Sequence, residues 1–293
     1  MPKAIFRRQS LIDQYSTLFK NTIAMCAKLQ HQKFHGQSTA AFSWRWGMMN
    51  TSLDYKAQDR MIDLYYCPTP NCQKVSIALE ELGLAYEVQP IDIVSGDQNQ
   101  PSYLEICPNR KVPAIVDSDG PGGQRLVLWE SAAILMYLAE KAGRLWPSDS
   151  MQQALGRQWL FWQMSYVGPM MGQLHHFVQY APEQLDYPIA RYTQETERLR
   201  RMLNQHLEGR DYILDDYSIA DIACWPWFQM FSFRYPNQAP YPHLEVWMKR
   251  LFERDAVQRG FMLDIDKVKP VVTGAEPVTD EVRRHLFASY QTD

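Results

Sequence analysis

The regular alternation of apolar and polar positions begins at Met61. Residues 62–66 form a short apolar run that ends at a Cys-Pro-Thr-Pro segment, which predicts a buried strand followed by a turn. The next apolar residues recur at the spacing of one face of a helix: Val75, Ala78, Leu79 and Leu82. Gly83 follows them, which predicts that the helix ends there. Residues 86–93 supply another strand, so the pattern predicts a βαβ unit with parallel strands.

Two further short strands and a helix complete this first layer. Residues 114–117 and 126–129 are apolar, and the segment between them is rich in Gly, Pro and Asp, which predicts a hairpin-type connection. Residues 131–141 place apolar side chains on one helical face and stop near Gly143. The pattern therefore predicts an α/β domain over residues 61–144.

Beyond residue 146 the pattern is entirely helical. An aromatic stripe predicts a first helix that the Gly168-Pro169 pair should break, and its members are Leu155, Trp159, Trp162 and Tyr166. We interpret this stripe as bundle core or as the wall of an acceptor pocket. Residues 192–207 repeat the helical spacing and end at Gly209.

Ser218 and Asp221 predict a capping box at the start of a helix. The residues that follow are apolar nearly all round, so this helix should be the buried centre of the bundle. A last bundle helix is expected at 243–252, and a short helix in the tail at 280–290. We therefore predict an all-α domain over 151–263 and a C-terminal tail over 264–293.

The first sixty residues follow a different pattern. Residues 1–50 contain seven Lys or Arg and one acidic residue, and their apolar positions show no sustained period. Such composition resembles an organelle transit peptide, but it lacks the apolar core and cleavage site of a secretory signal. We predict residues 1–60 to be a disordered basic extension, with an extension upstream of a true start at Met61 as a further alternative.

Composition narrows the possible functions. Apolar residues make up 46% and charged residues 22% of the 293, as in ordinary globular proteins. The net charge of −3 gives no basic surface for nucleic acid, and no apolar run is long enough to predict membrane insertion. Five cysteines are few for this length, so we expect a reducing, cytoplasmic location. Neighbouring His175 and His176 have no partners at ligand spacing, so we expect no metal.

The order of these elements, together with four motifs, resembles a cytosolic glutathione S-transferase across residues 61–263. The motifs are YYCPTPN at 65–71, PNRKVPA at 108–114, WESAAI at 129–134 and YSIAD at 217–221. The turn at 69–71 and the run that follows Ser218 are most similar to the bacterial nu class, which is related to a fungal nitrogen-regulator prion protein. The resemblance implies an N-terminal thioredoxin-like domain, an all-helical C-terminal domain, a homodimer and glutathione-dependent disulfide reduction.

Glutathione carries two carboxylates, an ammonium, amides and a thiol, and the resembling motifs offer partners for each. The Val112-Pro113 step, a candidate cis bond, would present a backbone edge to the ligand. At a helix start, Ser131 and its amide suit the γ-glutamyl carboxylate, while Glu130 suits the ammonium. The alternative is that this pair is only a helix cap.

Three more residues are predicted to hold the remaining polar groups of glutathione. Gln98 and Lys111 are candidate contacts, with Lys111 near the glycyl carboxylate. Arg191 lies where the nu class uses an arginine of the helical domain, in some cases from the partner subunit, to bind a glutathione carboxylate. As an alternative, lone polar residues in loops are often merely solvated.

The predicted sulfur site combines Thr69 and Asn71 at a helix start. Related redox proteins place a cysteine at the first of these positions, whereas this chain has a hydroxyl. The reactive sulfur is therefore expected from glutathione itself, with Asn71 fixing its position. Cys72 is either a second reactive thiol or, as we favour, a small apolar side chain.

The favoured hypothesis is an enzyme that uses glutathione to reduce disulfides. One alternative is a transferase that conjugates glutathione to electrophiles. Another is a regulatory module that binds glutathione without turnover, because the resemblance includes a fungal regulator. The intact Thr-Pro-Asn turn favours the enzyme.

Overall fold

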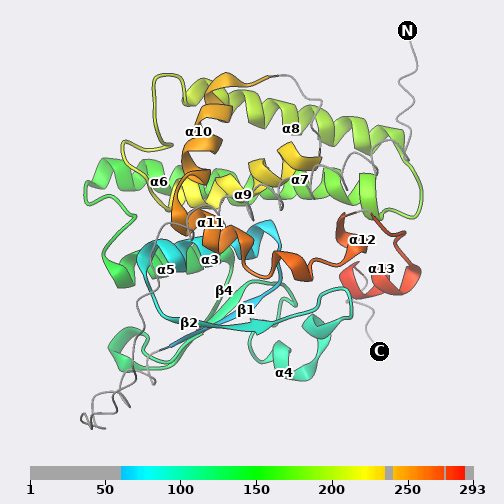
Figure 1. Cartoon of the computed structure of the whole chain (residues 1–293), viewed down its shortest axis with the longest axis horizontal. Helices are drawn as coiled ribbons and strands as arrows, with labels where there is room; N and C mark the ends of the chain where they lie inside the picture. Colours follow the sequence, from blue (N-terminus) through cyan, green and yellow to red (C-terminus); the bar gives the residue numbers. More distant parts are fainter. Residues whose placement is uncertain (1–60, 235–239, 274, 288–293) are drawn as a thin grey trace, which may run out of the picture.

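The computed structural model describes residues 61–234, 240–273 and 275–287 of the chain. Figure 1 shows a sheet at the lower side of the molecule with the helical bundle stacked above it. The predicted N-terminal extension, residues 1–60, lies outside the described residues, as do residues 288–290 of the predicted tail helix.

The sheet has four strands in the order β2-β1-β3-β4. The predicted βαβ unit consists of β1 (Ile62–Tyr66), α3 (Pro70–Leu82) and β2 (Tyr86–Pro90), and its two strands are parallel. The hairpin of β3 (Ala114–Asp117) and β4 (Leu126–Trp129) is antiparallel, and β3 also pairs antiparallel with β1. The predicted α/β and helical layers are both present, as expected for a thioredoxin-like domain followed by a helical domain.

The strand β2 ends earlier than the predicted residue 93 because a side chain turns the backbone. The Asp92 carboxylate accepts hydrogen bonds from the backbone N–H of Val94 at 3.1 Å and of Ser95 at 3.3 Å. Such local bonds replace the ladder bonds that a longer strand would make. The chain then passes through a 3₁₀ turn (Asp97–Asn99) and α4 (Pro101–Leu104).

The two faces of the sheet bury different cores. Ile62, Leu64 and Tyr66 alternate along β1 into a large core that continues into the helical bundle. The opposite face packs against α4 in a smaller core that contains Tyr103 and Val116. A strand places successive side chains on opposite faces, so this arrangement follows from the alternation.

The helix α5 (Ser131–Ala142) completes the α/β domain and lies beside α3. The bundle begins with α6 (Ser150–Trp162), a π-helical segment (Gln163–Val167), α7 (Gly168–His175) and a second π-helical segment (His176–Tyr180). Its remaining helices are α8 (Asp186–His206), α9 (Ile219–Arg234), α10 (Pro242–Phe252), α11 (Asp255–Met262), α12 (Pro270–Thr273) and α13 (Asp280–Phe287).

The predicted helix break at Gly168-Pro169 is wrong. Gly168 keeps helical angles, φ −57° and ψ −56°, and its N–H bonds to the carbonyl oxygen of Gln163. That bond spans five residues, so the helix widens for one turn just before Pro169, which has no N–H to donate. One continuous helical segment therefore runs from Ser150 to Tyr180, with two π-helical stretches inside it. We call it the long helical rod.

The start of α9 forms the predicted capping box, but a different backbone N–H donates to the Ser218 hydroxyl. The Asp221 carboxylate accepts the Ser218 N–H at 3.1 Å, as expected. The Ser218 hydroxyl accepts from the N–H of Ala220 at 3.2 Å rather than from Asp221. Asp221 also accepts from the Trp247 indole at 2.9 Å, which ties α10 to the same cap.

The helix α11 packs tightly onto α3. A Cβ at Gly260 would lie 2.5 Å from the backbone nitrogen of Ile77, so only glycine allows this approach. Ser76 donates to the carbonyl oxygen of Gly260 at 2.6 Å. An ion pair between Arg254 and Glu81 at 2.6 Å extends the same contact. These contacts hold α3, whose first turn carries the predicted sulfur site, against the helical domain.

Candidate functional site

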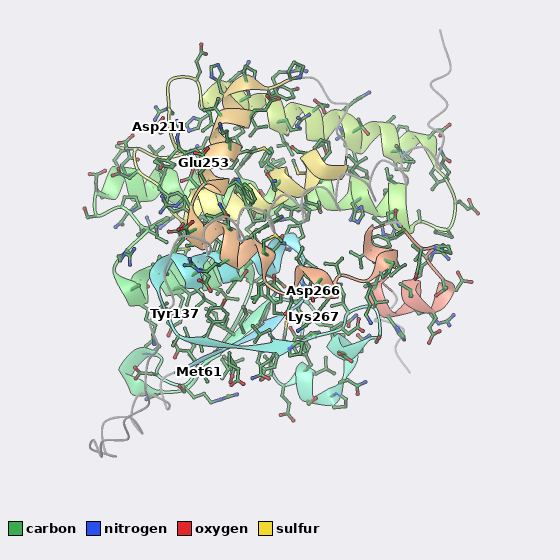
Figure 2. All side chains as sticks on the ribbon, viewed as in Figure 1. Met61, Tyr137, Asp211, Glu253, Asp266 and Lys267 are labelled. Carbon is green, nitrogen blue, oxygen red and sulfur yellow. The ribbon has the colours of Figure 1, made fainter. Side chains whose placement is uncertain are left out.

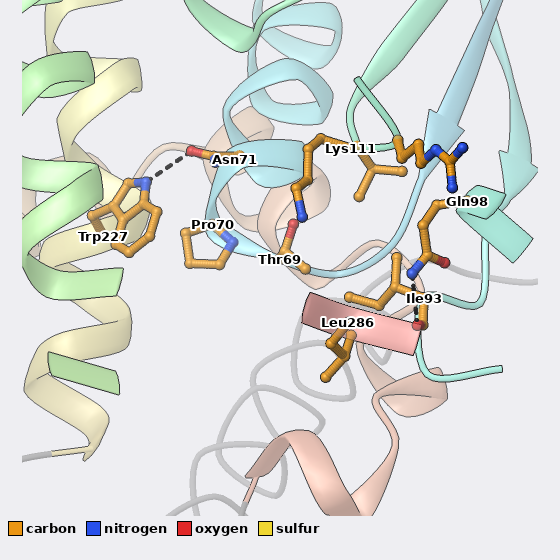
Figure 3. Close-up of a pocket in the computed structure, with 10 residues that line it drawn as sticks. Thr69, Pro70, Asn71, Ile93, Gln98, Lys111, Trp227 and Leu286 are labelled. Carbon is orange, nitrogen blue, oxygen red and sulfur yellow. Dashed lines mark hydrogen bonds between the residues drawn. The ribbon is translucent and has the colours of Figure 1, made fainter. Parts of the chain in front are cut away.

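A pocket of about 200 Å³ opens at the first turn of α3 (Figure 3). Of the predicted site residues, the pocket brings together Thr69, Asn71, Gln98, Lys111 and Val112. The other residues that line it are Pro70, Ile93, Arg110, Trp227 and Leu286. The pocket lining does not include the predicted residues Pro113, Glu130, Ser131 and Arg191.

Thr69 occupies the N-cap position of α3, as predicted, with an extended backbone at φ −119° and ψ 156°. Pro70 follows at the first helical position, where its missing N–H costs nothing. The Thr69 hydroxyl makes no capping hydrogen bond. The threonine therefore sets the start of the helix through its backbone, and its side chain lies between the pocket and the Cys72 thiol, with which it interacts.

Asn71 lies on the first turn of α3 and is held by a residue from the helical domain. The indole Nε1–H of Trp227 donates to Asn71 Oδ1 at 2.9 Å, as the dashed line in Figure 3 shows. Trp227 is on α9, so this bond links the two domains at the pocket. The asparagine side chain is therefore fixed before any ligand enters.

The cysteines beside this turn are unsuited to act as nucleophiles. Cys72 is fully buried, and burial raises the pKa of its thiol to about 12. Burial likewise raises the pKa of Cys67 to about 11. Because the thiolate is the reactive form, both groups are protonated near neutral pH. This favours the interpretation of Cys72 as a small apolar side chain over a second reactive thiol.

The loop before β3 supplies a backbone edge to the pocket. The peptide bond between Val112 and Pro113 is cis, which confirms the candidate. In the described residues, the N–H and C=O of Val112 have no backbone hydrogen-bond partner. The Tyr103 hydroxyl donates to the carbonyl oxygen of Lys111 at 2.7 Å and anchors the loop to α4. Val112 therefore offers both backbone groups to a ligand.

Gln98 is buried, and its amide is already partly occupied. Its Nε2 donates to the carbonyl oxygen of Ile93 at 3.1 Å and to that of His285 at 2.8 Å. Two carbonyl acceptors fix the amide orientation, because only the NH₂ group can donate to them. The Oε1 atom is buried without a partner in the described structure. Gln98 can therefore accept a hydrogen bond from a ligand N–H, but it has little capacity left to donate.

The tail helix α13 contributes to the pocket, which the sequence analysis missed. Leu286 lines the pocket, and the Nδ1–H of the His285 ring donates to the carbonyl oxygen of Val94 at 2.8 Å. Arg283 donates to the carbonyl oxygen of Tyr180 at the end of the long helical rod. Figure 1 shows α13 beside the strand-end loops of the sheet. The predicted tail helix is therefore part of the pocket wall.

Glu130 and Ser131 lie at the start of α5, and Ser131 contacts Lys74 near the beginning of α3. Glu130 is exposed and has a positive φ of 76°, which is costly for a residue with a Cβ. Ser131 is buried, and its hydroxyl accepts from the Lys74 ammonium at 3.2 Å. Lys74 comes one turn after Asn71, so α3 connects the two predicted halves of the site.

Lys74 itself is a buried cation that the sequence analysis missed. Its side chain is fully buried, and its Nζ donates to Gln163 Oε1 at 2.6 Å. Burial lowers the pKa of Lys74 to about 7, although Glu130 and two cysteines partly oppose the shift. The sequence did not indicate that Lys74 is buried, because a lysine on a helix usually reaches solvent.

Arg191 lies on α8, and its side chain is exposed. Its guanidinium pairs with Glu195, one turn later on the same helix, at 2.9 Å. Of the predicted aromatic stripe, Trp159 is core, but Leu155 and Tyr166 are exposed, and Trp227 instead supplies the aromatic pocket wall. The sequence signal for Trp227 was weak, because its neighbours on α9 are apolar nearly all round.

Two further surveys cover only the described part of the chain. No group of three or more His, Cys, Asp or Glu side chains could hold a metal ion there. Within the same residues, no helix has the length and apolar character needed to cross a membrane.

Family models match both parts of the chain. Residues 68–141 match the N-terminal domain of glutathione S-transferase, and residues 187–250 match its C-terminal domain. The disulfide-bond oxidoreductase YfcG of Escherichia coli (strain K12) is 45% identical over 204 residues, covering 69% of this chain and 95% of YfcG. YghU, another disulfide-bond oxidoreductase of that strain, is 37% identical over 213 residues. The match covers 68% of this chain and 73% of YghU.

Solved structures give the same relationship. A glutathione transferase from Pseudomonas putida, crystallised with one glutathione disulfide per subunit, has a TM-score of 0.67 and 42% identity. The match covers 69% of this chain and 91% of that one. A family member from Pseudomonas fluorescens with two glutathione molecules has a TM-score of 0.66, 40% identity and coverage of 71% and 96%. The sequence motifs, the fold and these relatives together establish that the chain belongs to the glutathione S-transferase family.

Proposed function

We propose that this protein reduces disulfide bonds with glutathione and that the working sulfur belongs to the bound glutathione. The observation that carries the proposal is the composition of the first α3 turn. Thr69 and Asn71 face the pocket there, while the nearest cysteine is buried and has a pKa of about 12. Relatives named as disulfide-bond oxidoreductases and structures with bound glutathione or its disulfide support the same chemistry.

In the proposed complex, the glutathione thiolate lies at the N-terminus of α3, near Thr69 and Asn71. The Val112 backbone pairs with the peptide centre of the ligand, and Lys111 attracts its glycyl carboxylate. The Oε1 atom of Gln98, buried and without a partner in the described residues, accepts a ligand N–H. At the glutamyl end, the Ser131 amide and hydroxyl bind the carboxylate and Glu130 binds the ammonium.

The reaction consists of two thiol–disulfide exchanges. The bound thiolate attacks one sulfur of the substrate disulfide, forming a glutathione mixed disulfide and releasing the other sulfur as a thiolate, which takes up a proton. A second glutathione thiolate then attacks the glutathione sulfur of the mixed disulfide. The products are glutathione disulfide and two substrate thiols, so two glutathione molecules supply the two electrons.

Positioning should contribute more to this reaction than activation of the thiol. If the site lowers the thiol pKa from about 8.5 to about 6.5, the thiolate fraction at pH 7 rises roughly 25-fold. A Brønsted slope of about 0.45 lowers the intrinsic nucleophilicity roughly eightfold over the same shift. The net gain is about threefold, whereas correct alignment of reacting atoms is worth far more.

Variants of Asn71 and Thr69 test the proposed function. Asn71→Ala should lower kcat for reduction of a small mixed disulfide by about 10-fold to 100-fold, as loss of one hydrogen bond to a charged sulfur predicts. Thr69→Ala should lower it by less than about threefold, because it removes part of the activation and little of the positioning. If Asn71→Ala keeps full activity while Thr69→Ala abolishes it, the proposed sulfur site is wrong.

The same assays distinguish the alternatives. Rapid conjugation of an aryl halide with negligible disulfide reduction would indicate an ordinary conjugating transferase. Tight binding of glutathione in a calorimeter without turnover of either substrate would indicate a regulatory module. Absence of binding at millimolar glutathione would contradict all three functions.

We further propose a cytoplasmic homodimer. Large apolar side chains are exposed on three consecutive elements of the described chain, β4, α5 and α6: Trp129, Met136, Met151, Leu155 and Phe161. Exposed apolar surface of this kind is typical of a protein interface. In such a dimer Arg191 would serve the glutathione site of the partner subunit. Four free cysteines in the described residues are consistent with a reducing compartment.

A further inference from the structure

The Asn71 amide is oriented by a group that can only donate. An indole has one N–H and no acceptor, so the atom that faces Trp227 Nε1 at 2.9 Å must be the amide oxygen. The Asn71 NH₂ group then occupies the other branch of the planar amide. No residue in the described structure accepts a hydrogen bond from this Nδ2, and Asn71 and Trp227 both line the pocket.

Trp227 is itself well fixed. Its side chain is 9% exposed and belongs to α9, the buried central helix. The far edge of the ring lies over α7, where a Cβ at Gly172 would meet it at 3.5 Å and one at Gly168 at 3.7 Å. Both distances are those of ordinary van der Waals contact, so the indole packs beside this helix. The ring therefore has little freedom to move away from Asn71.

The orientation of the amide decides what the ligand sulfur meets. With Oδ1 bonded to the indole, Asn71 presents an N–H donor, which favours a thiolate over a thiol. With the amide reversed, it would present a partly negative oxygen, which disfavours a thiolate. An exposed asparagine can interchange these two orientations, because its oxygen and NH₂ group have nearly the same shape.

We propose that Trp227 is a positioning residue that acts through Asn71. Its indole N–H locks the amide so that Nδ2 donates to the sulfur of the bound thiol. This inference rests on the proposed function, in which Asn71 faces the glutathione sulfur. It adds a residue of the helical domain to a sulfur site that otherwise lies in the α/β domain.

The decisive variant is Trp227→Phe, which keeps an aromatic ring and removes the N–H. The pKa of bound glutathione, followed by the ultraviolet absorbance of its thiolate against pH, should rise by about one unit. The Kd for glutathione should change less than about threefold, because most ligand contacts lie away from the sulfur. The kcat for disulfide reduction should fall several-fold, by less than in Asn71→Ala, because the released amide no longer holds the sulfur in line; the pKa change alone would alter the rate little.

Trp225→Phe is the matched control. Trp225 lies two residues earlier on α9 and also donates its indole N–H, to the carbonyl oxygen of Met248 at 3.0 Å, but it does not line the pocket. This variant should lose stability without moving the pKa of the bound thiol. A purely structural role for Trp227 predicts that both variants behave alike, and that result would overturn the proposal.

A double variant separates the inference from the proposed function. Because Trp227 acts through Asn71, Asn71→Ala/Trp227→Phe should have the thiol pKa and kcat of Asn71→Ala alone. If Asn71→Ala raises the thiol pKa and Trp227→Phe does not, the inference fails and the proposed function stands. If Asn71→Ala changes neither quantity, the proposed sulfur site itself fails.

If Trp227→Phe folds poorly, a tryptophan analogue without the N–H provides a second test. Incorporation of a benzothiophene analogue of tryptophan at position 227 keeps the bicyclic shape and replaces N–H by sulfur. It should reproduce the rise in thiol pKa with little loss of stability. An unchanged thiol pKa in this protein would contradict the proposal.

Discussion

At the scale of single residues, the role of a polar side chain depends on which of its atoms is already bonded. Gln98 was predicted as a general contact for glutathione, but its NH₂ group already donates to two carbonyl oxygens, leaving Oε1. Thr69 occupies the N-cap position, yet its hydroxyl makes no capping bond and its side chain interacts with the Cys72 thiol instead. Sequence identifies such residues by type, whereas the hydrogen-bond partners decide which atom is available.

Lys74 allows a prediction about pH at this scale. Its pKa is about 7 in the folded chain and about 10.4 in the unfolded chain, so between these values the unfolded state binds more protons. The contribution of Lys74 to the free energy of unfolding therefore rises with pH from about 7 to 10, by at most about 1.4 kcal/mol per unit.

Lys74→Met removes this titration. The free energy of unfolding, measured by urea denaturation at pH 7, 8, 9 and 10, should rise more steeply with pH in the wild type than in the variant. Below pH 7 the two proteins should run parallel, because both states of the wild type are then protonated. Parallel curves across the whole range would show that Lys74 keeps an ordinary pKa in the fold.

At the scale of elements, the start of α3 could be predicted from the sequence, but the packing of α11 against α3 could not. Threonine before proline sets the helix start locally, and the predicted N-cap position is correct. The contact of α11 with α3 joins residues far apart in the sequence, and nothing near Gly260 indicates it. The long rod from Ser150 shows a further limit, because a π-helical turn accommodates a proline that normally ends a helix.

Gly260→Ala tests the contact between α11 and α3. Alanine favours an isolated helix by about 1 kcal/mol over glycine. Here its Cβ would lie 2.5 Å from backbone atoms of Ile77, which cannot move aside like a flexible side chain. We expect a net loss of about 1–3 kcal/mol in the free energy of unfolding, seen as a lower urea midpoint at constant slope.

Arg259→Ala, one residue earlier on α11, is the control. It removes an ion pair to Glu80 whose arginine side chain is 58% exposed, so its cost should stay below about 1 kcal/mol. A Gly260→Ala protein as stable as the wild type would mean that the two helices can separate freely.

At the scale of the whole molecule, the pocket is assembled from distant parts of the chain. Thr69 and Asn71 come from the N-cap and first turn of α3, Trp227 from α9 and Leu286 from α13. Figure 2 shows that side chains fill the spaces between the sheet and the bundle. Each domain therefore supplies only part of the site, and the proposed homodimer would add Arg191 of a partner subunit.

The dimer proposal predicts the effect of a charge on its surface. Phe161 on α6 is 67% exposed, so Phe161→Asp should leave the fold intact and convert a dimer into a monomer. Analytical ultracentrifugation measures this directly. Val246→Asp, at a 57% exposed position on α10, is the control and should keep the wild-type mass. A monomeric wild type would contradict the proposal.

The sequence alone determined the order of the four strands and of the longer helices, the start of α3 and the residue types around the pocket, because these depend on periodicity and on local backbone preferences. It also identified five residues that line the pocket: Thr69, Asn71, Gln98, Lys111 and Val112. It did not predict the helices α4 and α11. Tertiary structure alone decided the rest, including the indole that orients Asn71, the burial of Lys74 and the wall formed by α13. Those features depend on contacts between residues more than fifty positions apart, for which the local sequence carries no signal.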